Sequence, residues 1–365
     1  MSKYILIMAW LGTMALVQMF MGCCREEKVF GKWEMRTIPI FGIIVLIPII
    51  WMAANRGTMM DTYAYLLGFR SMPESFNSVQ EYVLSVKKDK GFSVLSILIK
   101  MIFGSNEIVY LLVLATLQSL SLWIVYRKYS ENYLMSIFLF MASTDFVSWM
   151  CNGLRQFIAV TVIFSVTTLM LKRKYLPVIA VILLASTFHG TAILMLPLVF
   201  IAQGKAWNKR TILFTFMILL AVIYVDRFTG ILDSALYDTQ YANVVSDWTS
   251  WNDDGTNPVR VLFYSLPTII AIIGRKYIIG EDNQVINFCV NMSMISTDFY
   301  LVSMVTSGIF IGRLPIYASL YNYILLPWEI NHFFSKKSAK AVMIFFVFLY
   351  LSFYYYQMHI GWGLI

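Results

Sequence analysis

The sequence has little charge for its length. Asp, Glu, Lys and Arg make up 13% of the 365 residues, whereas the hydrophobic set AVILMFWYC makes up 59%. A soluble domain carries about 25% charged residues, because its surface is in contact with water. The shortage of charge excludes an ordinary cytosolic enzyme, a secreted disulfide-rich domain and a disordered tail. It indicates a polytopic membrane protein.

Cysteine and the common cofactor motifs are scarce as well. The four cysteines include the neighbours Cys23 and Cys24 and form no C-x-x-C or Cys/His spacing, so the sequence predicts neither a disulfide framework nor a metal site. It has no G-x-x-x-x-G-K-[ST], no G-x-G-x-x-G between a strand and a helix, and no H-E-x-x-H. We therefore expect no metal, no nucleotide and no other cofactor.

Long apolar runs are what the sequence has in quantity. They predict an all-α, polytopic helical membrane protein with about twelve membrane segments, since a crossing helix needs about 20 mostly apolar residues. Two runs, 175–188 and 190–203, are too short for a full bilayer, and Asp298 interrupts 285–311, so we expect short or broken helices there. We expect one membrane domain over residues 1–365. The other runs are 4–22, 37–54, 106–125, 133–150, 153–171, 211–225, 259–274, 314–334 and 341–357.

The basic residues predict an orientation. The net charge is +8, and short Lys/Arg-rich connections such as 25–36, 127–128 and 172–174 fall on one side of the membrane by the parity of the crossings. That side is expected to be the cytoplasm, which accounts for the positive charge without a nucleic-acid partner. Both termini and the long loops 55–105 and 226–258 are then expected to be extracytoplasmic.

The two long loops have different compositions. In loop 55–105, the piece 91–103 is apolar but too short to span, and it predicts a helix at the membrane interface or dipping into it. Loop 226–258 places Trp248 and Trp251 among carboxylates and amides. Such a mixture suits sugar binding, because aromatic rings stack on the apolar faces of sugars. An ordinary solvated loop with interfacial tryptophans is the alternative.

A few arginines stand where the positive-inside rule disfavours them. Arg155, Arg260 and Arg313 lie at predicted outer ends of separate segments, and Arg56 closes the second segment. Charge near a bilayer is costly, and membrane proteins keep it chiefly for function. Guanidinium groups bind phosphate oxygens at two points, so this set suits a lipid-linked diphosphate. The alternative for each is an arginine at a helix end that snorkels to the interface.

Two further side chains are candidates for acid–base chemistry. His189 lies between the two short apolar runs, and its imidazole could take a proton near neutral pH. A hydrogen-bonded structural histidine is the alternative. Asp61 follows the second segment, with Tyr65 four residues later. Its carboxylate is either simply solvated, or it binds a sugar hydroxyl or acts as a base.

Four stretches of the sequence resemble the EpsG family of exopolysaccharide polymerases, which is similar to the Wzy-type polymerases. Asp61 with Tyr65 resembles the family's D-Y-x-x-Y segment. The stretches LRQFIA (154–159), ASTFHGTA (185–192) and RLPIY (313–317) resemble L-R-Q-x-[IL]-A, A-x-x-F-H-x-[ST]-A and R-[LI]-x-x-Y. They occur in the family's order and cover residues from about 37 to 335 of the chain.

Two positions depart from the family pattern. Thr62 stands where the family often has its first tyrosine, and Gly312 stands where an acidic residue is common. These departures bear on the detailed role of Asp61 and on any carboxylate partner of Arg313. They do not affect the overall resemblance.

The resemblance implies a multi-pass enzyme of the bacterial plasma (inner) membrane, a membrane glycosyltransferase of the C-type architecture. It would join undecaprenyl diphosphate-linked oligosaccharide units, donor to acceptor, at the outer face, extending exopolysaccharide, capsule or O-antigen-type chains. Membrane lipid surrounds such an enzyme, and a chain-length regulator and a flippase are candidate partners. No cofactor is implied.

The resemblance and the residue chemistry together assign roles. The diphosphate would be bound by Arg155, Arg313, Arg260 and Arg56. His189 is the first candidate for the base and Asp61 the second. The candidate substrate-binding residues are Gln156, Tyr65, Tyr317, Trp248 and Trp251.

Other activities use similar membrane bundles. A lipid-linked oligosaccharide flippase or exporter often shows two similar halves, and none are evident here. A polysaccharide O-acyltransferase should carry an Arg-His pair near its first segments, and the first apolar segments here contain no histidine. A ligase that moves finished glycan to another acceptor shares the proposed chemistry most closely.

Overall fold

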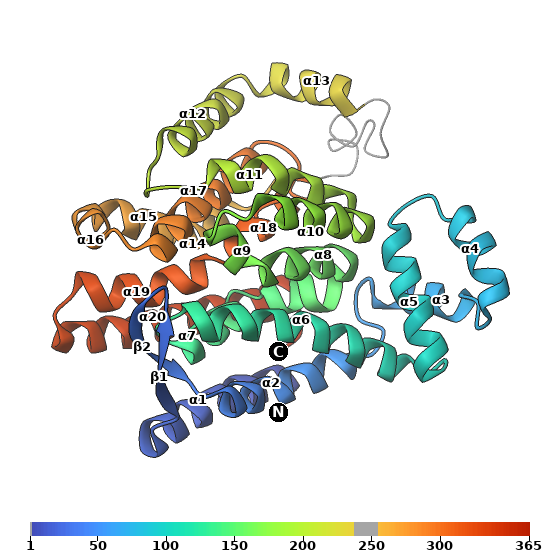
Figure 1. The fold of residues 1–365 in the computed structure, drawn as a ribbon, viewed down its shortest axis with the longest axis horizontal. Coiled ribbons are helices and arrows are strands. Elements are labelled where there is room, and N and C mark those ends of the chain that lie inside the picture. The colour runs from blue at the N-terminus through green and yellow to red at the C-terminus, as the bar shows by residue number, and fades with distance from the viewer. Residues whose placement is uncertain (1, 237–254) are drawn as a thin grey trace. The chain divides into compact units, whose positions relative to one another are not determined.

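The structure is a computed structural model that describes residues 2–236 and 255–365. Its described part consists of helices and one two-stranded hairpin (Figure 1). The chain forms two compact units: the first unit is Met1–Ile193 with Phe334–Ile365, and the second unit is Leu194–Phe333. The single membrane domain expected from the sequence stays a prediction, which this division does not test.

Four helices of the described chain are long and apolar enough to cross a membrane. They are α1 (Lys3–Met21), α6 (Glu107–Tyr129), α17 (Gln284–Met304) and α20 (Lys336–Tyr355) with the turn η6 (Tyr356–Gly361). Bent pairs raise the number to as many as six: α7 (Tyr133–Ala142) with η2 (Phe146–Asn152), and α12 (Lys209–Ile223) with α13 (Val225–Leu236). Shorter apolar helices are α2 (Pro39–Ala54), α8 (Leu154–Ser165), α10 (Tyr175–Phe188) and η3 (Gly190–Leu194) with α11 (Met195–Ile201). The prediction of a polytopic helical membrane protein with short and broken segments is confirmed.

In the first unit, α6 packs against α2 and α8, and α8 packs against α10. Gly42 makes the close approach of α2 possible, because a Cβ there would lie 2.8 Å from the Trp123 ring nitrogen. The Tyr133 hydroxyl also donates a hydrogen bond of 2.8 Å to the Gly42 carbonyl. A larger residue at position 42 would push α2 away from α6.

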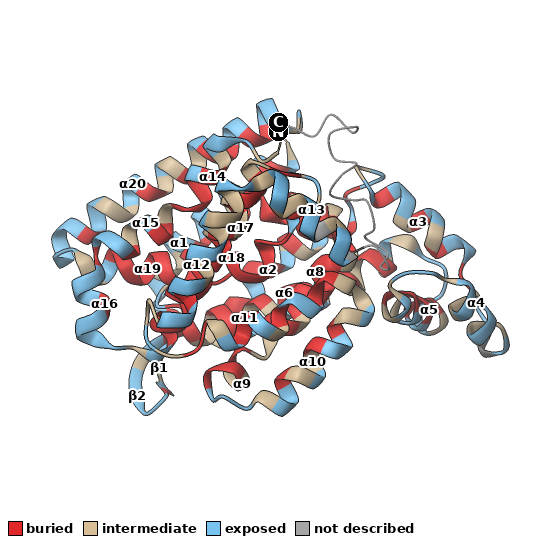
Figure 2. Ribbon diagram, turned by 90° about the horizontal axis from the view of Figure 1, so that it is seen from above, coloured by how far each residue is buried: buried red, intermediate tan, exposed pale blue. Residues whose placement is uncertain are grey.

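Both ends of the chain lie together in the first unit (Figure 2). The Ser2 hydroxyl donates to the Leu364 carbonyl at 3.2 Å, and the Tyr354 hydroxyl donates to the Tyr4 carbonyl at 3.2 Å. The two termini therefore lie at the same end of α1.

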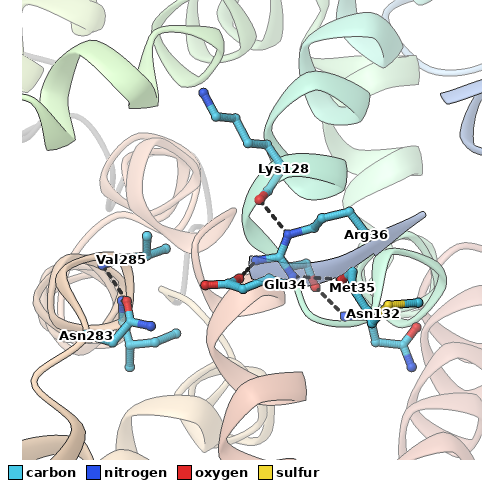
Figure 3. Close-up of polar contacts among 9 residues, drawn as sticks. Glu34, Met35, Arg36, Lys128, Asn132, Asn283 and Val285 are labelled. Carbon is cyan, nitrogen blue, oxygen red and sulfur yellow. Dashed lines mark hydrogen bonds and ion pairs between the residues drawn. The ribbon is translucent and has the colours of Figure 1, made fainter. Parts of the chain in front are cut away.

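A β-hairpin, β1 (Cys24–Val29) with β2 (Lys32–Thr37), forms the first basic connection, which the sequence did not predict as strands. Its two turn residues, Phe30 and Gly31, have φ of 46° and 88°, as a tight hairpin turn requires. Arg36 is 4% exposed and donates to the Lys128 carbonyl at 2.8 Å (Figure 3). The hairpin is thereby held against the end of α6.

Other basic connections gather at this same end of the first unit. Glu27 pairs with Arg127 of α6 at 2.7 Å. The side chains of Lys128 and Tyr129 contact the Thr168 hydroxyl at 3.1 and 2.7 Å, in α9 (Thr167–Leu171), directly before the basic residues 172–174. The hairpin and the ends of α6 and α9 thus form one basic end.

In the second unit, α17 packs against most other helices and is largely buried. It begins at a cap in which Asn283 Oδ1 accepts from the Val285 N–H at 2.9 Å (Figure 3). The break predicted at Asp298 is wrong: the helix runs through Asp298, whose carboxylate accepts from the Thr215 hydroxyl at 2.7 Å and so is not left without a partner. The chain leaves the helix only after Met304. The helices around α17 are α12, α14 (Pro258–Tyr264), α15 (Leu266–Ile273), α18 (Ile316–Ser319) and α19 (Asn322–Phe333).

Candidate functional site

The segment before α6 folds into short helices over the start of α8. They are α3 (Thr62–Ser71), η1 (Phe76–Ser78), α4 (Val79–Ser85) and α5 (Lys90–Phe103), the last confirming the helix predicted over 91–103. Phe69 of α3 stacks on Tyr110 of α6 with ring centroids 4.1 Å apart. The buried cluster that contains these two rings extends to Leu154, the first residue of α8. This packing brings α3 and α5 to the residues that precede and open α8.

Arg155 is in the first turn of α8. Its Nη1 donates to the Asp89 carboxylate at 3.0 Å, and its guanidinium lies over the Tyr65 ring, 5.4 Å from the centroid. The Arg155 side chain is 43% exposed, whereas that of Asp89 is 11% exposed. The guanidinium is thus held on two sides and still accessible to solvent.

Arg56 is buried instead. Its side chain is 4% exposed and donates to the Thr62 hydroxyl and the Ala53 carbonyl, both at 2.8 Å. Burial lowers the pKa of Arg56, and no ion pair to it exists within the described residues. Thr62 in turn donates to the Cys151 carbonyl at 3.3 Å. The threonine that departs from the family pattern thus links Arg56 to the segment before α8.

Asp61 precedes α3 and is exposed. Its backbone N–H donates to the Asn152 side-chain oxygen at 3.1 Å, while its carboxylate does not cap the helix. Asn152 is the last residue before Gly153 and α8. The carboxylate of Asp61 therefore faces solvent on a backbone tied to the segment that carries Arg155.

His189 ends α10. Its backbone N–H donates to the Ala185 carbonyl at 3.1 Å, and its Nδ1 lies 3.5 Å from the Thr191 hydroxyl. The start of α5 packs on this end of α10, since a Cβ at Gly91 would overlap the Thr187 hydroxyl. Phe188 packs against the same buried cluster as Leu154. The ends of α5, α8 and α10 thus meet in the first unit.

The remaining predicted arginines lie in the second unit. Arg260 is half-buried on α14, and Arg313 is exposed at the end of η5 (Ile311–Arg313). Thr256, before α14, donates its N–H to the Ser303 carbonyl at 2.8 Å. A Cβ at Gly312 would lie 2.8 Å from the Thr256 hydroxyl. Both arginines therefore belong to segments docked at the same end of α17, and the close packing explains a glycine where the family often has a carboxylate.

The other predicted substrate contacts differ in exposure. Tyr65 is half-buried beneath Arg155, and Gln156 and Tyr317 are buried at 3% and 4% exposure. Trp248 and Trp251 lie outside the described residues. All of these roles stay predictions.

Asp89 is the site residue that the sequence analysis missed. The available signal was the run Lys87-Lys88-Asp89-Lys90, in which one carboxylate stands among lysines. Within the described residues, no three His, Cys, Asp or Glu side chains are grouped so that they could hold a metal ion.

Comparison with known proteins gives one finding. The family model of the EpsG family matches residues 39–361, a range that includes all of the stretches discussed above. No curated protein and no solved structure matches the chain.

Proposed function

Because the chain belongs to the EpsG family, which is associated with exopolysaccharide biosynthesis, we propose that it is a polysaccharide polymerase. It joins oligosaccharide units carried on undecaprenyl diphosphate. The sugar–phosphate C–O bond of the donor breaks, and its lipid diphosphate leaves. A glycosidic bond forms to the terminal hydroxyl of the acceptor, whose proton passes to a base. The protein is then a membrane glycosyltransferase.

The surroundings of Arg155 are the observation that carries this proposal. The positive end of a helix dipole and a guanidinium coincide at the start of α8, although a cation there is unfavourable for the helix itself. Such a combination favours an anion with several oxygens. The guanidinium is partly exposed, so a diphosphate can reach it. Departure of a diphosphate requires charge stabilisation more than a proton, which this arrangement can supply.

The other roles follow from placement. His189 and Asp61 are the candidate bases, the first at the end of α10 and the second exposed before α3. Arg260 and Arg313 are proposed diphosphate ligands of the second unit. Arg56, buried on Thr62, is proposed to act by fixing the start of α3.

The proposed orientation uses the basic end of the first unit. The hairpin and the ends of α6 and α9 hold the lysines and arginines that the positive-inside rule assigns to the cytoplasm. Arg155 opens α8, and α9 follows the far end of that helix. We therefore propose that Arg155 works at the outer face of the plasma membrane.

The test is a polymerisation assay. Proteoliposomes that contain the protein receive the undecaprenyl diphosphate-linked unit of the producing cell, and products are separated on a gel. We expect a ladder that Arg155→Ala and Arg313→Ala each abolish. Arg25→Ala is the matched control, because it removes an exposed guanidinium from the basic end.

Other outcomes would assign other functions. Passage of labelled lipid-linked units across the bilayer without a ladder would refute the polymerase and indicate a flippase or exporter. Transfer of an acyl group to the glycan would indicate an O-acyltransferase. A ladder that persists in both arginine variants would support the polymerase activity but refute the role of these arginines as diphosphate ligands.

A further inference from the structure

Asp89 has an unusual backbone for a residue with a side chain. Its φ and ψ are 55° and 44°, in the left-handed region, where a Cβ crowds the backbone. It occupies the N-cap position of α5, for which aspartate is among the best residues. Yet its side chain accepts no hydrogen bond from the first turn of that helix. Asp89 therefore lacks the hydrogen bond of an N-cap and also has an unfavourable backbone conformation.

The Asp89 carboxylate is instead directed to Arg155, 3.0 Å from Nη1. The nearby lysines Lys87, Lys88 and Lys90 are exposed, whereas the Asp89 side chain is only 11% exposed. The contact with Arg155 is a single hydrogen bond, not a two-pronged pair. A ligand with several phosphate oxygens would satisfy the guanidinium better.

From this geometry we infer that Asp89 is an internal anion that occupies Arg155 in the absence of substrate and is displaced by the diphosphate of the substrate. The inference rests on the proposed function for the identity of that ligand. When the diphosphate binds, Asp89 is released, its backbone moves from the left-handed to the extended region that N-cap residues adopt, and its carboxylate accepts from the N–H of Gly91 or Phe92. Two discrete arrangements of one residue thus exchange as the site fills.

The exchange has a mechanical consequence at the end of α10. Gly91, two residues after Asp89, packs directly on Thr187. His189 is two residues after Thr187 in the sequence. A change in the first turn of α5 is therefore transmitted to the segment that carries the candidate base. The release of Asp89 couples occupation of Arg155 by phosphate to the position of His189.

The test measures binding of inorganic diphosphate to the purified full-length protein in nanodiscs. Asp89→Asn removes the charge, while asparagine still tolerates the left-handed conformation. We expect its Kd to fall about two- to five-fold, the range for loss of a competing, partly exposed ion pair. Glu81→Gln is the matched control, because it removes an exposed carboxylate of α4 that contacts no arginine in the described structure. We expect it to leave the Kd unchanged.

A double variant separates direct competition from a general change of charge. Arg155→Ala should bind weakly, and adding Asp89→Asn to it should restore nothing. A second readout is hydrogen–deuterium exchange at Gly91 and Phe92. Diphosphate should slow exchange there in the native protein, and Asp89→Asn should show the slow exchange before any ligand is added.

Each result has a stated meaning. An unchanged or higher Kd for Asp89→Asn overturns the inference, as does the absence of diphosphate binding to any variant. A lower Kd that depends on Arg155, in a protein that makes no ladder, supports the inference and refutes the polymerase. A ladder that needs Arg155, with no effect of Asp89→Asn on diphosphate binding, supports the polymerase and refutes the inference about Asp89.

Discussion

Replacing Gly91 with alanine tests the packing that joins α5 to α10. In an exposed helix, glycine to alanine gains about 1 kcal/mol of stability, because the unfolded chain loses freedom. At position 91 the new Cβ would overlap the Thr187 hydroxyl and lie within 3.0 Å of its carbonyl carbon. Overpacking of this kind costs about 1–3 kcal/mol. The chain must shift, because backbone as well as side chain is in the way.

Gly68→Ala is the matched control. It lies in α3, where a Cβ would meet nothing within 4 Å, so it should show the full gain. Gly91→Ala should therefore be less stable than Gly68→Ala by about 1–3 kcal/mol, or about 2–4 °C in Tm for each kcal/mol. Thermal unfolding in detergent measures the difference, and Gly91→Ala with Thr187→Ala should recover part of it.

The same variants have different expected activities. Gly91→Ala should also slow polymerisation, since it displaces the start of α5 and the end of α10 together, whereas Gly68→Ala should not. If Gly91→Ala is as stable and as active as Gly68→Ala, the close approach of the two helices is absent, and the link from Asp89 to His189 fails with it.

Three further predictions concern charge and hydrogen bonding. Arg155→Ala should lower the initial polymerisation rate about 10²–10³-fold, and Arg155→Lys should recover only part of it, because lysine lacks the guanidinium fork; equal rates for lysine and arginine would contradict two-point phosphate binding. The Arg127 hydrogen bond holds the pKa of Glu27 below its ordinary value of 4.5. Docking of the hairpin on α6 should therefore be complete above pH 4.5 and weaken as the pH falls through the lowered pKa. Limited proteolysis of the hairpin should show this pH dependence, and Glu27→Gln should abolish it. Thr62→Val should cost about 1–3 kcal/mol in thermal unfolding, because Arg56 loses a buried acceptor, whereas Thr62→Ser should be nearly neutral.

The membrane helices were predictable because composition alone specifies them. The runs 4–22 and 106–125 correspond closely to α1 and α6, since an apolar stretch of that length has few alternatives in lipid. The β-hairpin was missed because its many charged residues, four of them consecutive at 25–28, predict only a solvated connection. Its formation depends on the left-handed turn at Phe30 and Gly31 and on the docking of Arg36.

The candidate site was predictable in part. A lone arginine at the start of an apolar run identified Arg155, and the family pattern identified Tyr65, which the structure places beneath it. Asp89 is 66 residues from Arg155 in sequence, and no periodic pattern encodes a contact over that distance. The roles of Thr62 and Gly312 likewise depend on neighbours from distant segments.

The closeness of the two ends of the chain has a consequence for the order of assembly. Because the second unit is inserted between two parts of the first, α1 enters the membrane early in synthesis, but its contact with Tyr354 arises only after residues 194–333 have been made. Until then α1 has only the earlier helices α2 and α7 to pack against. The first unit begins first and closes last, so a nascent chain that has emerged from the ribosome as far as Phe333 should contain a complete second unit while the first unit still lacks residues 334–365.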